Sequence, residues 1–233
     1  MEKDIICVCE VKEDIDDLIA LDFLYRSGRL KGVVLDPPPK TREDYEKVNM
    51  IKEKGIQIYK AIPTCKSIFV GGALTSVARY LLTNKLDNLI MNGGYVGNNI
   101  VQEEKQLSKF KGKEYVRTFN FSLDIDSTRY VLSSPNINNI FLIGKNVCHD
   151  KRNTLSGIWK EELWISEYPI NEEKRLHDVL AYSEGLNLID GKESERLIYK
   201  KVRVKEKKMD NGIIKFGSDL DETTNITAAI MWK

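Results

Sequence analysis

The sequence predicts an α/β protein with a mostly parallel, Rossmann-like open sheet flanked by helices, and with additional antiparallel strands at its C-terminal end. Short runs rich in Ile, Val and Leu alternate with segments of helical periodicity along most of the chain. This alternation is typical of parallel strands joined by crossover helices. Near the C-terminus, apolar runs instead flank Asn211-Gly212, a dipeptide that favours a tight hairpin between antiparallel strands.

The first half of the chain supplies strands and helices in turn. Residues 4–10 are rich in Ile, Val and Cys and predict a strand, and an apolar stripe at helical spacing predicts a helix over residues 15–25. Thr41, followed three residues later by Asp44, predicts the capped start of another helix. The remaining elements expected here are strands at 32–35, 56–59, 67–70 and 89–91, and a helix at 73–82.

The second half continues the alternation and then changes character. Residues 101–113 are polar and rich in lysine, and they predict a surface loop. Helices are expected at 124–132, 154–164 and 171–182, and strands at 139–147, 196–207, 213–216 and 225–232. Because no internal repeat and no low-complexity linker interrupts the chain, residues 1–233 are interpreted as a single domain.

Charge and composition exclude several classes of partner. The formal net charge is +1, which creates no global field that favours nucleic acid or an anionic membrane. The basic segment at 105–113 is bordered by Glu103, Glu104 and Glu114, so a solvated loop is the better interpretation. No stretch approaches the roughly 20 apolar residues of a membrane span. Without a visible signal peptide, the four cysteines are expected to be reduced thiols of a cytoplasmic protein.

Residues with chemical potential fall where the predicted strands end. Glu10 ends the first strand, Gly71-Gly72 another, Gly93-Gly94 a third and Cys148-His149 a fourth. In open α/β sheets, ligands bind at the carboxyl ends of the strands. These positions are therefore expected to lie around one binding site.

Five carboxylates crowd the first strand-to-helix turn, in residues 10–17. Acids in the first turn of a helix complement its dipole, which explains two of them but not five. Carboxylates this close repel one another unless a cation is present, and oxygen ligands select hard cations such as Ca²⁺ or Mg²⁺. A metal, a polyhydroxy ligand and a simple helix start all remain open from this segment alone.

Two further motifs are weak on their own. His177-Asp178 is compatible with an ordinary, partly exposed helix start. The glycine-rich turn at 93–98 follows a strand, and such turns are common.

In combination, however, six segments match in order a known pattern. Residues 10–18 hold the acid cluster, 69–76 a strand-turn-helix, 91–98 the Met and glycine-rich turn ending in Gly97-Asn98, 118–126 a Phe-Asn pair before an acid-rich helix start, 147–149 a Val-Cys-His, and 176–178 the late His-Asp. Together they resemble the inosine-uridine preferring nucleoside hydrolase family, whose members are calcium-dependent and usually longer than 233 residues.

The resemblance implies a role for each matching residue. It implies a Ca²⁺ held by Asp17, Asp178 and the backbone carbonyl of Gly71, which binds the ribose diol and the attacking water. Asp16 would bind the ribose hydroxyls. The other expected roles are sugar binding by Asn98 and Asn120 and protonation of the leaving base by His177. Members of the family commonly form dimers or tetramers, and homo-oligomerisation is expected here.

The chain also departs from the family pattern. Lys12 stands where the family has an aspartate that binds metal and acts as general base. In one alternative, the Lys12 ammonium lies in the substrate site and replaces the charge of the Ca²⁺. In the other, Lys12 points away and Glu10, which matches the family's first aspartate, acts as the catalytic carboxylate. Thr118 replaces a glutamate that binds the sugar 5′-hydroxyl, and the family's asparagine after its second strand has no clear match beside Asp36.

The resulting hypothesis is hydrolysis of the N-glycosidic bond of a ribonucleoside to free base and ribose. The substrate is either an ordinary ribonucleoside or a modified one. The alternative is a catalytically silent nucleoside-binding or regulatory protein with the same fold. A phosphoryl-transfer receiver-like domain would use Asp36 and Lys145, but the chain is too long for it and His177-Asp178 would be unexplained.

Overall fold

The computed structural model describes residues 2–11, 15–159, 171 and 173–233. Its strands are β1 (Ile5–Cys9), β2 (Leu30–Leu35), β3 (Ile58–Tyr59), β4 (Ser67–Val70), β5 (Leu86–Met91), β6 (Ile137–Leu142), β7 (Leu197–Lys208), β8 (Ile214–Leu220) and β9 (Ile226–Trp232). Its α-helices are α1 (Asp16–Arg26), α2 (Arg42–Glu53), α3 (Thr75–Leu81), α4 (Phe119–Leu123), α5 (Ile125–Leu132), α6 (Lys145–Cys148) and α7 (His177–Ile189).

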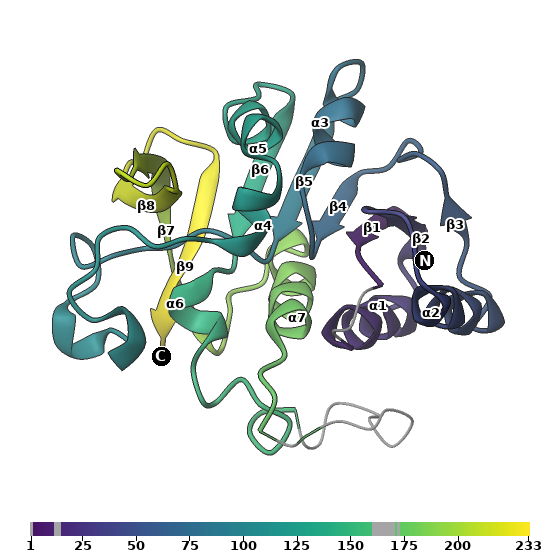
Figure 1. Ribbon diagram of the computed structural model, residues 1–233, viewed down its shortest axis with the longest axis horizontal. Coiled ribbons are helices and arrows are strands. Elements are labelled where there is room, and N and C mark those ends of the chain that lie inside the picture. Colours follow the sequence, from purple (N-terminus) through teal and green to yellow (C-terminus); the bar gives the residue numbers. More distant parts are fainter. Residues whose placement is uncertain (1, 12–14, 160–170, 172) are drawn as a thin grey trace.

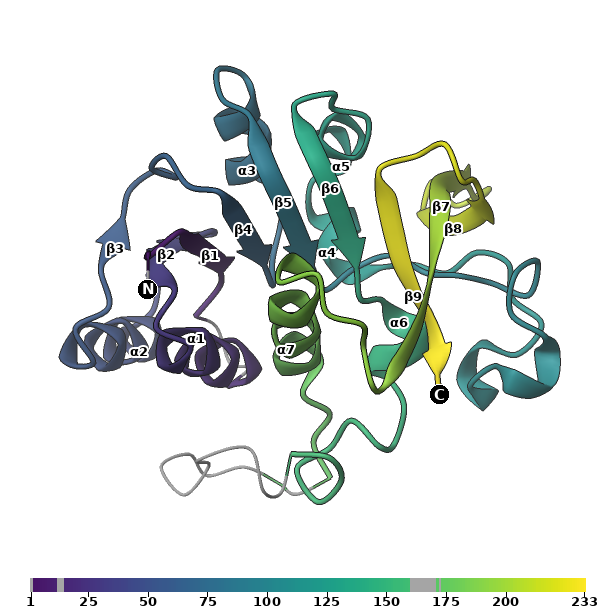
Figure 2. The same cartoon turned by 180° about the vertical axis from the view of Figure 1, so that it is seen from behind.

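The strands form one sheet in the order β3-β2-β1-β4-β5-β6-β9-β7-β8, which Figures 1 and 2 show from opposite sides. The strands from β3 to β9 in this order are parallel, whereas β7 is antiparallel to both β9 and β8. The α/β prediction with antiparallel C-terminal strands is confirmed. The strand order reverses between β1 and β4, and such a switch point opens a crevice for ligands at the carboxyl ends of the strands.

Helices cover both faces of the sheet. Apolar residues of α1, α2 and α7 pack on one face, and those of α3, α4 and α5 pack on the other (Figure 1). Along β1, Cys7 and Cys9 point to the first face and Ile6 and Val8 to the second. All five residues of β1 are therefore buried, as expected for a central parallel strand covered on both sides.

Most predicted elements are found close to their expected positions. The capping box at the start of α2 is confirmed, because Thr41 Oγ1 accepts from Asp44 N at 3.1 Å and Asp44 Oδ2 accepts from Thr41 N at 3.0 Å. The hairpin between β7 and β8 turns at residues 209–213, where the Met209 backbone N–H donates to the Ile213 carbonyl. Cys7, Cys9 and Cys148 are buried free thiols, and Cys65 is a partly buried one.

The strand predicted at 139–147 was wrong in its second half. The strand ends at Leu142, and residues 145–148 form the short helix α6. The turn between them brings Gly144 against the β5 loop, where a Cβ atom would lie 2.4 Å from the Gly94 carbonyl oxygen. This close backbone approach, which local periodicity does not encode, redirects the chain into the helix.

Two predicted helices also differ. α7 begins at His177 rather than at residue 171 and continues to Ile189. Thr154 forms an isolated bridge with Arg175, residues 155–159 form turns, and the rest of the predicted 154–164 helix lies outside the described residues. The five-residue helix α4 was not predicted.

Among the described helices, none combines the length and the apolar character that a membrane crossing requires.

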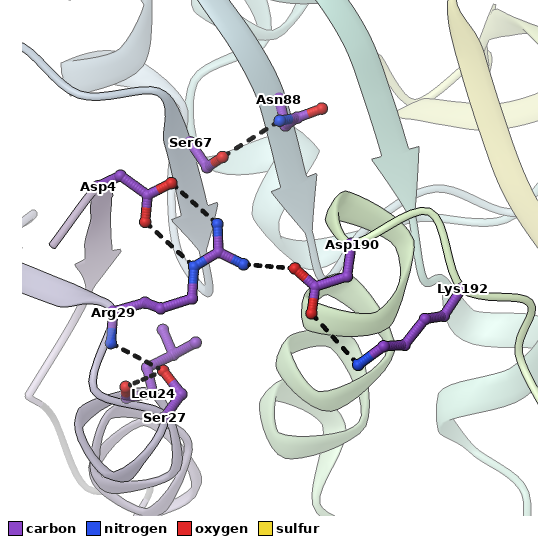
Figure 3. Close-up of polar contacts among 8 residues, drawn as sticks. All are labelled: Asp4, Leu24, Ser27, Arg29, Ser67, Asn88, Asp190 and Lys192. Carbon is purple, nitrogen blue, oxygen red and sulfur yellow. Dashed lines mark hydrogen bonds and ion pairs between the residues drawn. The ribbon is translucent and has the colours of Figure 1, made fainter. Parts of the chain in front are cut away.

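A polar cluster joins the elements at the end of the sheet away from the switch-point crevice (Figure 3). The Arg29 guanidinium donates to both carboxylate oxygens of Asp4, at 3.1 and 2.8 Å, and to Asp190 Oδ1 at 2.7 Å. Asp4 precedes β1, Arg29 precedes β2 and Asp190 follows α7. The guanidinium therefore fastens the end of α7 to the first two strands. Lys192 contacts the same Asp190 at 3.4 Å but is largely exposed.

We predict that Arg29→Ala lowers the free energy of unfolding by about 2 kcal/mol, because it removes charge-assisted bonds to two carboxylates. Lys192→Ala, which removes one exposed ion pair, should change it by less than about 0.5 kcal/mol. Urea denaturation of both variants measures the difference. Equal effects of the two substitutions would contradict this role of Arg29.

Candidate functional site

A cavity of about 260 Å³ lies at the carboxyl ends of β1, β4 and β5. Its wall includes the residues that follow these strands and the first residues of α1, α4 and α7. The lining residues are Glu10, Asp16, Asp17, Gly71, Asn92, Gly93, Thr118, Phe119, Asn120, Lys145, Cys148, His149, His177 and Asp178. The cavity is thus located at the switch point of the sheet, as the strand-end rule predicted.

Three buried aspartates form the acidic floor of the cavity. Asp16 and Asp17 start α1 and Asp178 starts α7, and their exposed fractions are 3%, 4% and 5%. Asp16 Oδ2 accepts a hydrogen bond from the Asp178 backbone N–H at 3.0 Å. Two helix N-termini therefore meet here, and their partial positive charges offset part of the carboxylate repulsion.

Gly71 makes room for these carboxylates at the end of β4. A Cβ atom at this position would lie 2.9 Å from Asp17 Oδ1, 3.0 Å from Asp178 Oδ1 and 3.0 Å from the Tyr182 hydroxyl. The missing side chain therefore leaves a space on which two carboxylate oxygens and one hydroxyl converge. Only glycine allows the sheet backbone to approach the acidic floor this closely.

Two asparagines organise the same region. Asn92 Nδ2 donates to Asp178 Oδ1 at 2.9 Å and orients that carboxylate. Asn120 Nδ2 donates to the carbonyl oxygens of Gly71, at 3.0 Å, and of Asn92, at 2.8 Å. Because both amide hydrogens of Asn120 are used, its side chain can offer a ligand only the acceptor Oδ1. Such an acceptor suits a hydroxyl group or a water molecule.

Among the described residues, the neighbours of Asp17 do little to compensate its negative charge. Burial raises the pKa of this carboxyl well above its usual value, and the negative charges of Asp178, Asp16 and Glu10 raise it further. Within the described chain, Asp17 Oδ1 is buried and accepts no hydrogen bond. A buried carboxylate oxygen in this condition needs a proton or a cation.

The donors beside Gly71 are all oxygens, as a hard cation requires, but they are few in number. Asp17 Oδ1 and Asp178 Oδ1 converge beside the Gly71 backbone, and all donors there are oxygens, which Ca²⁺ prefers. However, the described residues contain no preformed group of three Asp, Glu, His or Cys side chains arranged to hold a metal. Two carboxylates and a carbonyl are the ligands that this part of the chain offers.

A basic wall, formed by Lys145, His149 and His177, lines the same cavity as the acidic floor. His149 and His177 meet edge to face with ring centroids 4.6 Å apart, and Lys145 Nζ lies 3.4 Å from His149 Nε2. Burial, followed by the neighbouring His177 and Lys145, lowers the pKa of His149 from 6.5 to about 3. His149 is therefore a neutral ring at neutral pH, and it holds the edge of His177 at the cavity.

The structure brings together most of the residues that the sequence singled out, but not all of them. Asn98 does not line the cavity; it is exposed, and its amide donates to the Gly112 carbonyl at 3.3 Å while its backbone N–H donates to Lys113. Its expected sugar contact therefore has no geometric support. Lys12 lies outside the described residues.

Asn92, Phe119 and Lys145 line the cavity but were not chosen as site residues from the sequence. Asn92 directly follows β5, so the strand-end rule could have identified it. Lys145 follows the unexpected turn at Gly144, and no local signal announced its position.

No protein-family model matches this chain, and no curated protein matches it either. The chemistry of the cavity is therefore the basis for assigning a function.

Asp17→Asn should stabilise the metal-free protein, because it removes a buried charge beside Asp178 and Asp16. We expect its melting temperature in chelator to rise by about 2–4 °C, equivalent to ~1 kcal/mol for a chain of this size. The matched control is Asp22→Asn on the same helix, which breaks ion pairs with Arg26 and Lys54 and should lower the melting temperature. Shifts of the same sign would refute the uncompensated charge at Asp17.

The low pKa of His149 predicts acid sensitivity. In the unfolded chain this ring takes up a proton below pH 6.5, whereas in the folded protein it does so only near pH 3. The contribution of His149 to the free energy of unfolding is fully present above pH 6.5 and is lost as the pH falls toward 3. Partial solvent screening reduces the loss between pH 6.5 and about 5 to ~1 kcal/mol. His149→Gln should flatten the measured pH profile, and an unchanged slope would exclude His149 as its source.

Proposed function

We propose that the protein hydrolyses the N-glycosidic bond of a ribonucleoside to free base and sugar. The observation that carries this proposal is the buried group of Asp16, Asp17 and Asp178, fixed by two helix N-termini around a small polar cavity. Cleavage of a glycosidic bond builds positive charge on the sugar ring. Carboxylates that are already positioned stabilise such charge without reorganisation during the reaction.

The sugar would be oriented by groups on the floor of the cavity. Asn120 Oδ1 is available to accept from a sugar hydroxyl, because the amide hydrogens of this residue are held by backbone carbonyls. Asp16, held by the Asp178 backbone N–H, is placed to accept from a second hydroxyl.

A bound Ca²⁺ would be held by Asp17, Asp178 and the Gly71 carbonyl, whose second lone pair remains after the hydrogen bond from Asn120. When bound, it would lower the pKa of a coordinated water and orient it toward the sugar. This assignment also accounts for the otherwise unsatisfied Asp17 Oδ1. Glu10, at the end of β1, lines the same cavity and is the proposed general base.

The leaving base would meet the histidine side of the cavity. His177 starts α7 beside Asp178, and its ring is fixed against neutral His149. We assign to His177 the transfer of a proton to the departing nitrogen. His149 stays neutral at physiological pH and therefore acts as a positioning residue for His177 rather than as a second acid.

A catalytically silent nucleoside-binding protein is the second candidate. It is favoured by the lack, among the residues described, of a third acidic side chain in metal-binding geometry.

We also propose a cytoplasmic location, because the described cysteines are free thiols. A homo-oligomeric assembly is proposed from the family resemblance.

The decisive assay is release of free sugar from a panel of ribonucleosides, with Ca²⁺ or with a chelator. We expect release that requires Ca²⁺, and Asp178→Asn should lower kcat/KM by at least about 100-fold because it removes a carboxylate from the reaction centre. Asn98→Ala, outside the cavity, should stay within about 2-fold of the unmodified protein. Nucleoside binding without release would instead establish the silent binding protein.

A further inference from the structure

We propose that the substrate is a nucleoside monophosphate, whose phosphate group binds the basic wall of the cavity at Lys145 and Thr118. This inference rests on the proposed function and specifies its substrate class. It follows from features of the cavity lining that hydrolysis of a neutral nucleoside leaves unused.

Lys145 is the first of these features. It starts α6, lines the cavity and is partly buried, and its Nζ lies 3.4 Å from His149 Nε2. Among the described residues, no carboxylate lies within ion-pair distance of its ammonium group, whereas the partly buried Arg29 and Lys54 each have such a partner. A partly desolvated ammonium without a counter-charge is costly, and an anionic ligand would remove that cost.

Other cations add to the positive potential at this wall. Lys109 and Arg117 lie close enough to lower the pKa of Lys145, after the larger effect of its burial, and Lys109 and Arg175 act in the same way on His149. The ion pairs found between described residues include none of these three exposed cations. The basic wall thus carries excess positive charge while the floor carries excess negative charge.

Thr118 supplies an independent observation. Its side chain lines the cavity and is 2% exposed, and its hydroxyl oxygen is buried without a hydrogen-bond partner in the described chain. A buried hydroxyl normally finds a partner, and its absence here indicates a group supplied by a ligand. A hydroxyl donates well to phosphate oxygens, and those oxygens also attract the ammonium of Lys145.

One molecule that satisfies both sides of the cavity must combine a polyhydroxy sugar with an anion. A nucleoside monophosphate does so: its sugar hydroxyls match the acceptors at Asn120 and Asp16, and its phosphate matches Lys145 and Thr118.

The reaction consumes one water molecule. The bond from the anomeric carbon to the base nitrogen breaks, a bond from that carbon to the water oxygen forms, and the proton from water ends on the base. The products are free base and ribose phosphate.

The test compares each ribonucleoside with its 5′- and 3′-monophosphates, assayed separately, as substrates of the full chain with Ca²⁺. We expect kcat/KM to be at least about 10-fold higher for one monophosphate than for the parent nucleoside. Lys145→Met, which keeps side-chain length without charge, should lower kcat/KM for the preferred monophosphate to the value for the parent nucleoside. Lys145→Arg should retain the preference. Lys113→Met, an exposed lysine outside the cavity lining, controls for a general loss of positive charge.

The outcomes separate the two proposals. If nucleosides are cleaved at least as well as monophosphates, or if Lys145→Met leaves the preference intact, the inference is overturned while the hydrolase assignment stands. If nothing is cleaved, the hydrolase assignment fails, and calorimetric titration with ribose 5-phosphate and ribose decides the inference. Tighter binding of ribose 5-phosphate that is lost in Lys145→Met would support a phosphate site. Equal binding of the two probes would overturn it.

Discussion

The site depends on one hydrogen bond, in which the Asp16 carboxylate accepts from the backbone N–H of Asp178. This bond joins the first turn of α1 to the first turn of α7 and brings the two helix dipoles to one point. Gly71 then allows the end of β4 to approach the same point, because any side chain there would collide with Asp17 and Asp178. The acidic floor exists only while all three elements keep this arrangement.

Well-paired charges and crowded carboxylates lie at opposite ends of the strands. At one end of the sheet, Arg29 bonds to two carboxylates and fastens α7 to the first two strands. At the other end, carboxylates crowd together and Asp17 holds its proton more tightly than an ordinary aspartate because of burial and its acidic neighbours. The well-paired end can offset the repulsion at the other, which is the usual relation between a rigid scaffold and a strained functional site.

The cavity is also polarised across its width. Three buried aspartates and the side chains of Lys145, His149 and His177 line the same cavity. A ligand that carries both polarities would be complementary to a cavity lined in this way. Under the phosphate-site proposal, Lys145, which has no carboxylate within ion-pair distance among the described residues, and the buried hydroxyl of Thr118 would bind the anionic group of the ligand.

The sequence by itself determined the alternation of strands and helices, the capping box at Thr41, the hairpin at Asn211-Gly212 and the acid cluster after β1, because each depends on residues within a few positions. It also indicated that residues at strand ends would meet. Only the tertiary structure decided which of them do: Asp178 reaches Asp16 across 162 positions, Asn92 and Lys145 enter the cavity, and Asn98 turns away to bond with the 112–113 loop. The physical reason is that the reversal of strand order beside β1, and the close backbone contact at Gly144, are set by packing between distant segments and leave no trace in local periodicity.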